Sequence, residues 1–243
     1  MKIRKEIQQK MAVTNLQIHN ELSRRFKRVT SNSSKKINTE EWDAYFNEAY
    51  RAWVKARVSV AKTNSKVRYD LRPLEIINEK LKIKEDAKSW VIAELPKNYY
   101  NIQSIAIMAK CKDCDKAYSL DDVYFLQGND WRSTISDPNW KPSFLWRRAP
   151  VDENSEGLRI GVGDYKIESI HIDYYRLPNP IYSVELSECY VDLRQTMGNV
   201  NRGFELNDFQ MDEIVDIAVY YASRDVGNFI EAKTQYEKII NYK

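Results

Sequence analysis

The stretch KIESIHIDYYRLPNPI, residues 166–181, decides the fold of this chain. In it, Ile170, Ile172 and Tyr174 alternate with polar residues. A period of two among β-branched and aromatic residues predicts a strand with one buried face. The two prolines at its end stop the strand, because proline lacks the N–H that a ladder needs. We therefore expect a central strand of a sheet here.

The stretch NDFQMDEIVDIAVYYASRDVG, residues 207–227, has the strongest helical pattern in the chain. Asn207 can cap the helix, with Gln210 as its capping-box partner. Apolar residues then follow at a spacing of three and four, which predicts a helix over 208–226 with one buried face. We expect that face to pack on the sheet, and it consists of Met211, Ile214, Val215 and Ala218.

A second long helix is predicted from TEEWDAYFNEAYRAWVKARVSVAK, residues 39–62. Asn38 and Glu41 form another capping box at its start. Its aromatic stripe includes Trp42 and Trp53, and we interpret the stripe as core or subunit packing, because no polar catalytic group converges on it.

The order of helices, then strands, then helices predicts an α+β fold, with an antiparallel β-sheet core flanked by long N-terminal and C-terminal helices. The other expected elements are a helix over 14–28, strands over 89–95 and 102–110, a short helix over 120–127, a hairpin of 158–162 with 166–175, and a final helix from Asn228 to about Ile240.

Charge is distributed unevenly along the chain. Residues 1–36 carry ten basic and two acidic side chains, a net charge of +8, while the remainder carries 28 basic and 33 acidic ones, a net charge of −5. We therefore expect a basic N-terminal arm and helix over 1–36 and a single α+β domain over 37–243. Such an arm suits an acidic protein surface or nucleic acid, and a solvated terminus is the alternative. The residues it would present are Arg24, Arg25, Lys27 and Arg28.

The segment 128–150 is predicted to be a long loop rich in aromatic side chains. It holds Trp131, Trp140 and Trp146 together with three prolines. Long loops of this composition commonly meet a partner, so we expect an intersubunit or partner surface.

Catalytic and cofactor signatures are weak. The chain has seven glycines and no phosphate-binding glycine string, and its two histidines lack a motif around them. Cys111 and Cys114 have a zinc-like spacing without a second pair, so we expect no metal and no cofactor. A hydrolase that uses acids such as Asp113 and Glu168 is the weaker alternative function.

No apolar run is long enough to span a membrane, and the odd number of cysteines fits a reducing compartment.

Several stretches together resemble head–tail connector proteins of short-tailed bacteriophages, the ring or adaptor proteins of crAss-like phages in particular. They are WDAYFNEAYRAWVKA, WVIAELPKNYY, SDPNWKPSFLWRR, IESIHIDYYRLPNPI and DFQMDEIVDIAVYYASRDVG, and the resemblance spans roughly residues 14–240.

The resemblance implies a virion protein that is not an enzyme and is assembled in the host bacterial cytoplasm. About twelve copies would form a ring below the portal, with DNA passing through the lumen and no membrane involved. The partners would be the portal and other neck or tail proteins. A nucleic-acid-binding module that uses the basic arm is the alternative, and we favour protein docking, because a lumen for sliding DNA should not grip phosphates.

Overall fold

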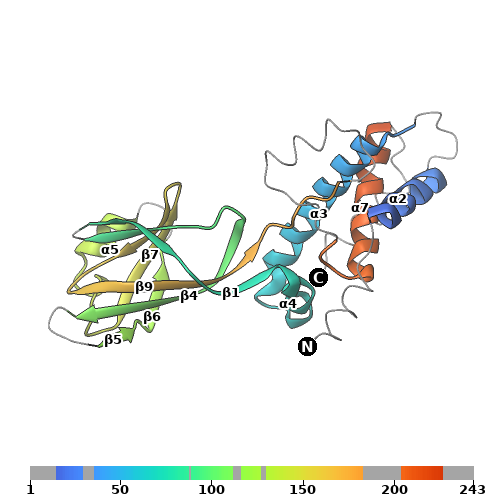
Figure 1. Cartoon of the computed structure of the whole chain (residues 1–243). Helices are drawn as coiled ribbons and strands as arrows, with labels where there is room; N and C mark the ends of the chain where they lie inside the picture. Colours follow the sequence, from blue (N-terminus) through green and yellow to red (C-terminus); the bar gives the residue numbers. More distant parts are fainter. Residues whose placement is uncertain are drawn as a thin grey trace. The chain divides into compact units, whose positions relative to one another are not determined.

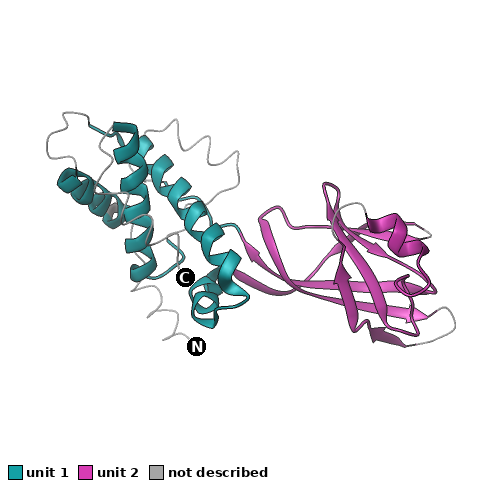
Figure 2. Cartoon of the chain, turned by 180° about the vertical axis from the view of Figure 1, so that it is seen from behind, with its two compact units in different colours: residues 1–74, 177–243 teal, residues 75–176 magenta. Residues whose placement is uncertain are grey.

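The computed structural model describes residues 15–29, 36–87, 89–111, 116–126, 130–182 and 204–226. The chain forms two compact units, one of residues 1–74 with 177–243 and the other of residues 75–176 (Figure 2). The first is helical and the second is built mainly from strands (Figure 1).

The helical unit contains α2 (Asn15–Val29), α3 (Thr39–Ala61), α4 (Ser65–Leu71), the short 3-10 helix η1 (Arg72–Leu74) and α7 (Asp208–Val226). Both predicted capping boxes are confirmed. At α3, the N–H of Glu41 donates to Asn38 Oδ1 at 2.8 Å, and the N–H of Asn38 donates to Glu41 Oε2 at 2.9 Å. At α7, Asn207 and Gln210 make the same reciprocal pair at 2.9 and 3.2 Å. These bonds satisfy N–H groups that have no partner within the helix.

Helix α7 lies beside α3 and α2 (Figure 1), and its apolar face is buried there. Ile214, Val215 and Ala218 are fully buried there, together with Leu22 and Phe26 of α2. The prediction that this face lies on a sheet is therefore wrong. A helical stripe indicates that one face is buried, but it does not say which element covers it.

The strand unit contains β1 (Glu75–Lys80), β2 (Lys82–Asp86), β3 (Trp90–Glu94), β4 (Tyr99–Cys111), β5 (Ala117–Ser119), β6 (Asp122–Phe125), α5 (Trp131–Ser136), β7 (Arg148–Asn154), β8 (Gly157–Gly161) and β9 (Tyr165–Arg176). One sheet has the order β1-β9-β4-β5 and the other β2-β3-β8-β7-β6. Neighbouring strands in the described residues pair antiparallel, apart from the parallel pair of β6 and β7.

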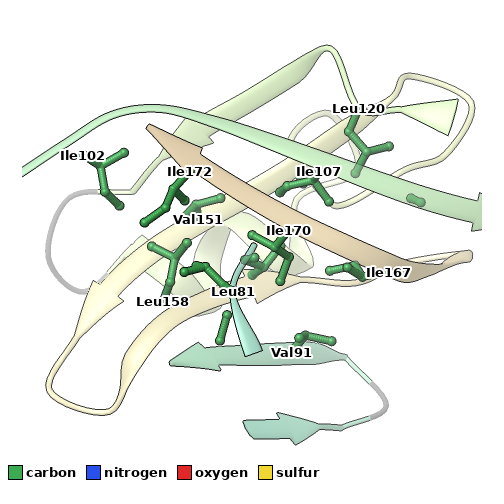
Figure 3. Close-up of a cluster of buried hydrophobic side chains, with 14 of the residues drawn as sticks. Leu81, Val91, Ile102, Ile107, Leu120, Val151, Leu158, Ile167, Ile170 and Ile172 are labelled. Carbon is green, nitrogen blue, oxygen red and sulfur yellow. The ribbon is translucent and has the colours of Figure 1, made fainter. Parts of the chain in front are cut away.

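Strand β9 lies inside its sheet, between β1 and β4. The predicted alternation is confirmed, because Ile170, Ile172 and Tyr174 are each at most 1% exposed. They belong to one apolar core with side chains of the second sheet such as Val151 and Leu158 (Figure 3). Burying each of these isoleucines contributes about 1.5–3 kcal/mol to stability. The two sheets are thus held together by a shared core.

Two local predictions are wrong. The expected helix over 120–127 is replaced by strand β6, which pairs in parallel with β7. The expected hairpin of 158–162 with 166–175 does not form, although both strands exist. Strand β8 pairs with β3 and β7, whereas β9 pairs with β1 and β4, so the chain crosses between sheets at this point. In both cases the outcome depends on pairing with strands distant in sequence.

The mixed α+β class is confirmed, but the unit boundaries differ from the expected 1–36 and 37–243. They fall after Leu74 and after Arg176, beside Pro73 at the first boundary and Pro178 and Pro180 at the second. The helix predicted over 14–28 is α2. The arm over residues 1–13 and the final helix predicted from Asn228 to Ile240 lie outside the described residues.

Candidate interaction surfaces

The strand unit exposes apolar side chains on residues 138–147, which we call the tryptophan tip. Trp140 is 53% exposed, Leu145 80% and Trp146 70%. Side chains of this size and polarity are usually covered, so three of them within seven residues mark a surface that suits a partner.

A closed turn carries the end of the tryptophan tip. The N–H of Ser143 donates to the carbonyl of Arg148 at 3.1 Å, and the N–H of Arg148 donates back to Ser143 at 2.8 Å. Within this ring the N–H of Arg147 donates to the carbonyl of Phe144 at 3.1 Å, and Arg147 adopts a left-handed φ of 48°. Leu145 and the residue after it therefore occupy the apex of a defined turn.

Phe144 anchors the turn to the strand unit. Its half-buried ring lies 6.1 Å from the ring of Tyr118 and 6.4 Å from that of Tyr165, measured between centroids. Its backbone N–H donates to Asp164 Oδ1 at 2.7 Å. The anchor leaves Leu145 and Trp146 pointing to solvent while their neighbour packs inward.

Trp140 is held by β6 and β7. The Arg148 guanidinium lies over its ring at 5.1 Å from the centroid, and Arg148 Nε donates to Asp122 Oδ2 at 2.5 Å. The ring of Tyr124 lies 5.8 Å from the Trp140 ring, and its hydroxyl donates to the Trp140 carbonyl. Burial raises the pKa of the Tyr124 hydroxyl, so it remains a neutral donor near pH 7.

The other three tryptophans that the sequence suggested as interface candidates are buried inside the protein. Trp131 is buried, with the Arg159 guanidinium 4.1 Å from its ring centroid. Trp42 and Trp53 are 3% and 1% exposed in the helical core, and Trp53 Nε1 donates to Glu213 Oε2 at 2.7 Å. For Trp42 and Trp53 the structure therefore shows core packing, one of the two expectations, in place of an interface role, and Trp131 is likewise covered by its own chain. An aromatic residue in the sequence does not reveal which chain covers its ring.

The predicted basic residues of α2 divide into two groups. Arg25 is bound within the helical unit: its Nη1 lies 2.6 Å from Asp216 Oδ1, and its Nη2 pairs with Asp212. Arg24 pairs with Glu21 on the surface at 2.6 Å, and Lys27 and Arg28 are exposed. Arg25 therefore joins α2 to α7, and the cations left facing solvent are Arg24, Lys27 and Arg28.

Among the residues that the structure describes, no three histidine, cysteine, aspartate or glutamate side chains are grouped so that they could hold a metal ion. Cys111 is disulfide-bonded and so offers no thiolate ligand, while Cys114 lies outside the described residues. Asp122 is paired with Arg148, and Glu168 is exposed on β9. Asp173 accepts hydrogen bonds from Ser104 Oγ and from the backbone, which gives it a structural role.

Sequence reasoning missed Leu145, the most exposed large apolar side chain of the tip. It also missed the Arg148–Asp122 pair that holds Trp140. The string FLWRR does contain a signal, since an apolar run between a proline-containing turn and two arginines is unusual for a plain connector.

None of the described helices is long and apolar enough to cross a membrane. Known protein families give no match to the chain, and no curated protein matches it either.

Proposed function

We propose that the chain is a structural, non-enzymatic subunit of a ring that joins head and tail in a short-tailed bacteriophage. About twelve copies would close the ring below the portal and surround the DNA channel. The observation that carries this proposal is the exposure of Leu145 and Trp146 on a hydrogen-bonded turn of the tryptophan tip. A ring requires each subunit to present a patch that fits a different patch on the next one.

The construction of the tip suits such a contact. Affinity at an interface comes mainly from a few aromatic or large apolar anchors that fill pockets on the partner. Ordering a mobile side chain on binding costs about 0.5–1.5 kcal/mol, and the turn of Ser143 to Arg148 is already ordered by its own hydrogen bonds. Trp146 can therefore dock without loss of backbone freedom.

The helical unit supplies a second surface for the same assembly. Arg24, Lys27 and Arg28 lie on the exposed side of α2. The rest of the chain after residue 36 carries a net charge of −5, so the basic surface complements the acidic body of a neighbouring subunit or the portal.

The test is the mass and shape of the full chain, alone and co-expressed with the portal protein of its own genome. Light scattering and electron microscopy should find closed rings under at least one of these conditions. The double variant Leu145→Ala/Trp146→Ala should remain folded but form at least tenfold fewer rings, since removal of central anchors costs about 2 kcal/mol or more.

Phe209→Ala is the matched control, because Phe209 is 69% exposed on α7 and lies outside the tip. It should assemble like the parent chain. Monomers under both conditions, or equal assembly of the tip variant, would contradict the proposal.

A nucleic-acid-binding module remains the second candidate, and the exposed cations of α2 favour it. If they bind DNA, the logarithm of the binding constant should fall with the logarithm of salt concentration by about 0.9 for each phosphate contacted. Arg24→Ala/Lys27→Ala/Arg28→Ala should then reduce that slope by up to about three. Negligible DNA affinity of the parent chain leaves only protein docking.

A further inference from the structure

The strand unit exposes two isoleucines on the edge strands β1 and β2. Ile77 of β1 is 68% exposed and Ile83 of β2 is 41% exposed. Strand β1 is the last strand on one side of the first sheet, and β2 is the last strand on one side of the second. Only Leu81 separates the two strands in the chain. Residues 75–86 therefore form one continuous edge, which we call the isoleucine edge.

The tryptophan tip is attached to the strands at the other side of both sheets, namely β5 and β6. The ring of Tyr118 on β5 lies 6.1 Å from that of Phe144, and the N–H of Asp122 on β6 donates to the carbonyl of Arg147 at 3.1 Å. The same compact unit thus presents two different apolar patches, one at each side of its sheets. Two such patches are what a head-to-tail contact between identical subunits requires.

The backbone of the isoleucine edge is irregular. The pairing register shifts between Ile76 and Glu79 in β1 and between Ile83 and Glu85 in β2. Asn78 has a left-handed φ of 58°, and its N–H donates to Asp173 Oδ1 at 2.8 Å. Such bulges interrupt the regular row of N–H and C=O groups with which an added strand would pair. A partner therefore meets this edge through its side chains.

Lysines accompany the two isoleucines, because Lys80, Lys82 and Lys84 are all exposed along the same edge. An ammonium group is attracted to the face of a tryptophan ring, and the tip exposes two such rings beside Leu145. The two arginines of the tip each pair with an aspartate, Arg147 with Asp121 at 2.8 Å and Arg148 with Asp122 at 2.5 Å. These pairs reduce the repulsion that the arginines would exert on the lysines.

We propose that the tryptophan tip of one subunit docks on the isoleucine edge of a second copy of this chain. The inference rests on the ring proposed above and names the two patches that meet in it. Leu145 and Trp146 would cover Ile77 and Ile83, and the lysines would face the indole rings. Because the two patches differ, each subunit can use both at once, so the same contact repeats around the ring.

The test uses two variants that each lack one patch. The tip variant Leu145→Ala/Trp146→Ala keeps the edge, and the edge variant Ile77→Asp/Ile83→Asp keeps the tip. All four positions are exposed, so circular dichroism and melting temperature should match those of the parent chain. Each variant alone should form at least about tenfold fewer rings, because the contact loses its anchors or gains two carboxylates against apolar side chains.

A mixture of the two variants gives the sharper result. The intact tip of the edge variant can dock on the intact edge of the tip variant, while the other two patches are disabled. Sedimentation velocity of the equimolar mixture should therefore show a heterodimer that neither variant forms by itself, and no ring. The mixture is studied under whichever condition gives rings with the parent chain.

Phe209→Asp is the matched control, because Phe209 on α7 is 69% exposed, as Ile77 is, and receives the same substitution. It should form rings like the parent chain. A second arm changes the lysines. Lys82→Glu/Lys84→Glu should reduce ring formation, while Lys82→Arg/Lys84→Arg should retain it, since a guanidinium also binds the face of an indole ring.

Three outcomes would overturn the inference. If the parent chain and the edge variant form rings equally well, the tip docks elsewhere, and the ring itself stands. If both variants lose the ring but their mixture gives no heterodimer, the tip and the edge serve separate contacts. If the parent chain forms no ring and the mixture no heterodimer, the proposed function fails and this contact fails with it.

Discussion

The guanidinium of Arg57 on α3 lies 2.6 Å from Oε2 of Glu213 on α7, and both side chains are largely buried. The same carboxylate oxygen accepts the hydrogen bond from Trp53 Nε1. Removing one partner of a buried ion pair leaves a charge without compensation, at a cost of about 3–5 kcal/mol. Glu213→Leu should therefore lower the free energy of unfolding of the helical unit by about 3 kcal/mol, measured by urea denaturation and helical circular dichroism.

The double variant Arg57→Met/Glu213→Leu is the control for that experiment. Replacing both charges with apolar groups removes the desolvation penalty along with the attraction, so it should recover part of the loss. A double variant less stable than Glu213→Leu would contradict this account of the pair.

The Arg25 contacts with Asp212 and Asp216 should be worth less, because these side chains are partly exposed and solvent screens them. Arg25→Ala should lower the free energy of unfolding by about 1 kcal/mol. Arg28→Ala, on an exposed position of the same helix, should change it by less than about 0.5 kcal/mol. An equal effect of the two substitutions would argue against a structural role for Arg25.

Ile214 is fully buried between α7 and its neighbouring helices. Ile214→Asp would bury a carboxylate without a partner, so soluble expression should be lost. Phe209→Asp changes an exposed position five residues earlier on the same helix and should express normally. A soluble Ile214→Asp chain with the melting temperature of the parent would refute the helical packing described here.

Gly163 permits the tryptophan tip to lie close to the strand unit. A Cβ at this position would fall 2.3 Å from the backbone carbonyl oxygen of Pro142, which cannot move as a side chain could. Gly163→Ala should displace the tip and reduce ring formation, even though Leu145 and Trp146 are unchanged. Ser155→Ala, on an exposed turn between β7 and β8, should assemble normally. Unaltered assembly of Gly163→Ala would mean that tip position is unimportant.

Tyr45 should make the stability of the helical unit sensitive to alkaline pH. Burial, and then its hydrogen bond to Asp225, raise the pKa of Tyr45 to about 12 from 10. Because the folded state holds this proton more tightly, the contribution to stability is complete below pH 10 and is lost as the pH rises toward 12. Tyr45→Phe should therefore reduce the decline of the urea midpoint between pH 9 and pH 11. An unchanged decline would show that other groups dominate it.

Sequence patterns predicted correctly those features that depend on residues close together in the chain. The alternation in β9 and the capping boxes of α3 and α7 depend on residues within a few positions of each other, and each is confirmed. The partner of the α7 face could not be predicted, because α2, α3 and a sheet offer chemically similar apolar surfaces. The sequence of strand β6 alone does not distinguish it from a helix, because its parallel pairing with β7 joins residues 26 positions apart.

The candidate surface was predicted only in outline. Of the three tryptophans in the segment 128–150, Trp131 turns inward under Arg159, while Trp140 and Trp146 are exposed. Exposure depends on long-range contacts such as Phe144 with Tyr165, for which the sequence of the segment alone carries no signal.

The strand unit is an insertion, and this has a consequence for biosynthesis. Its first and last strands are neighbours, with Glu75 opposite Tyr175, so the unit is complete as soon as residue 176 has left the ribosome. The helical unit must wait longer, because the ion pairs that join Arg25 and Arg57 to α7 need carboxylates that come more than 150 residues after α3 begins. During translation the nascent chain should therefore acquire protease resistance in its middle before its beginning, and the first helices would need shelter until α7 emerges.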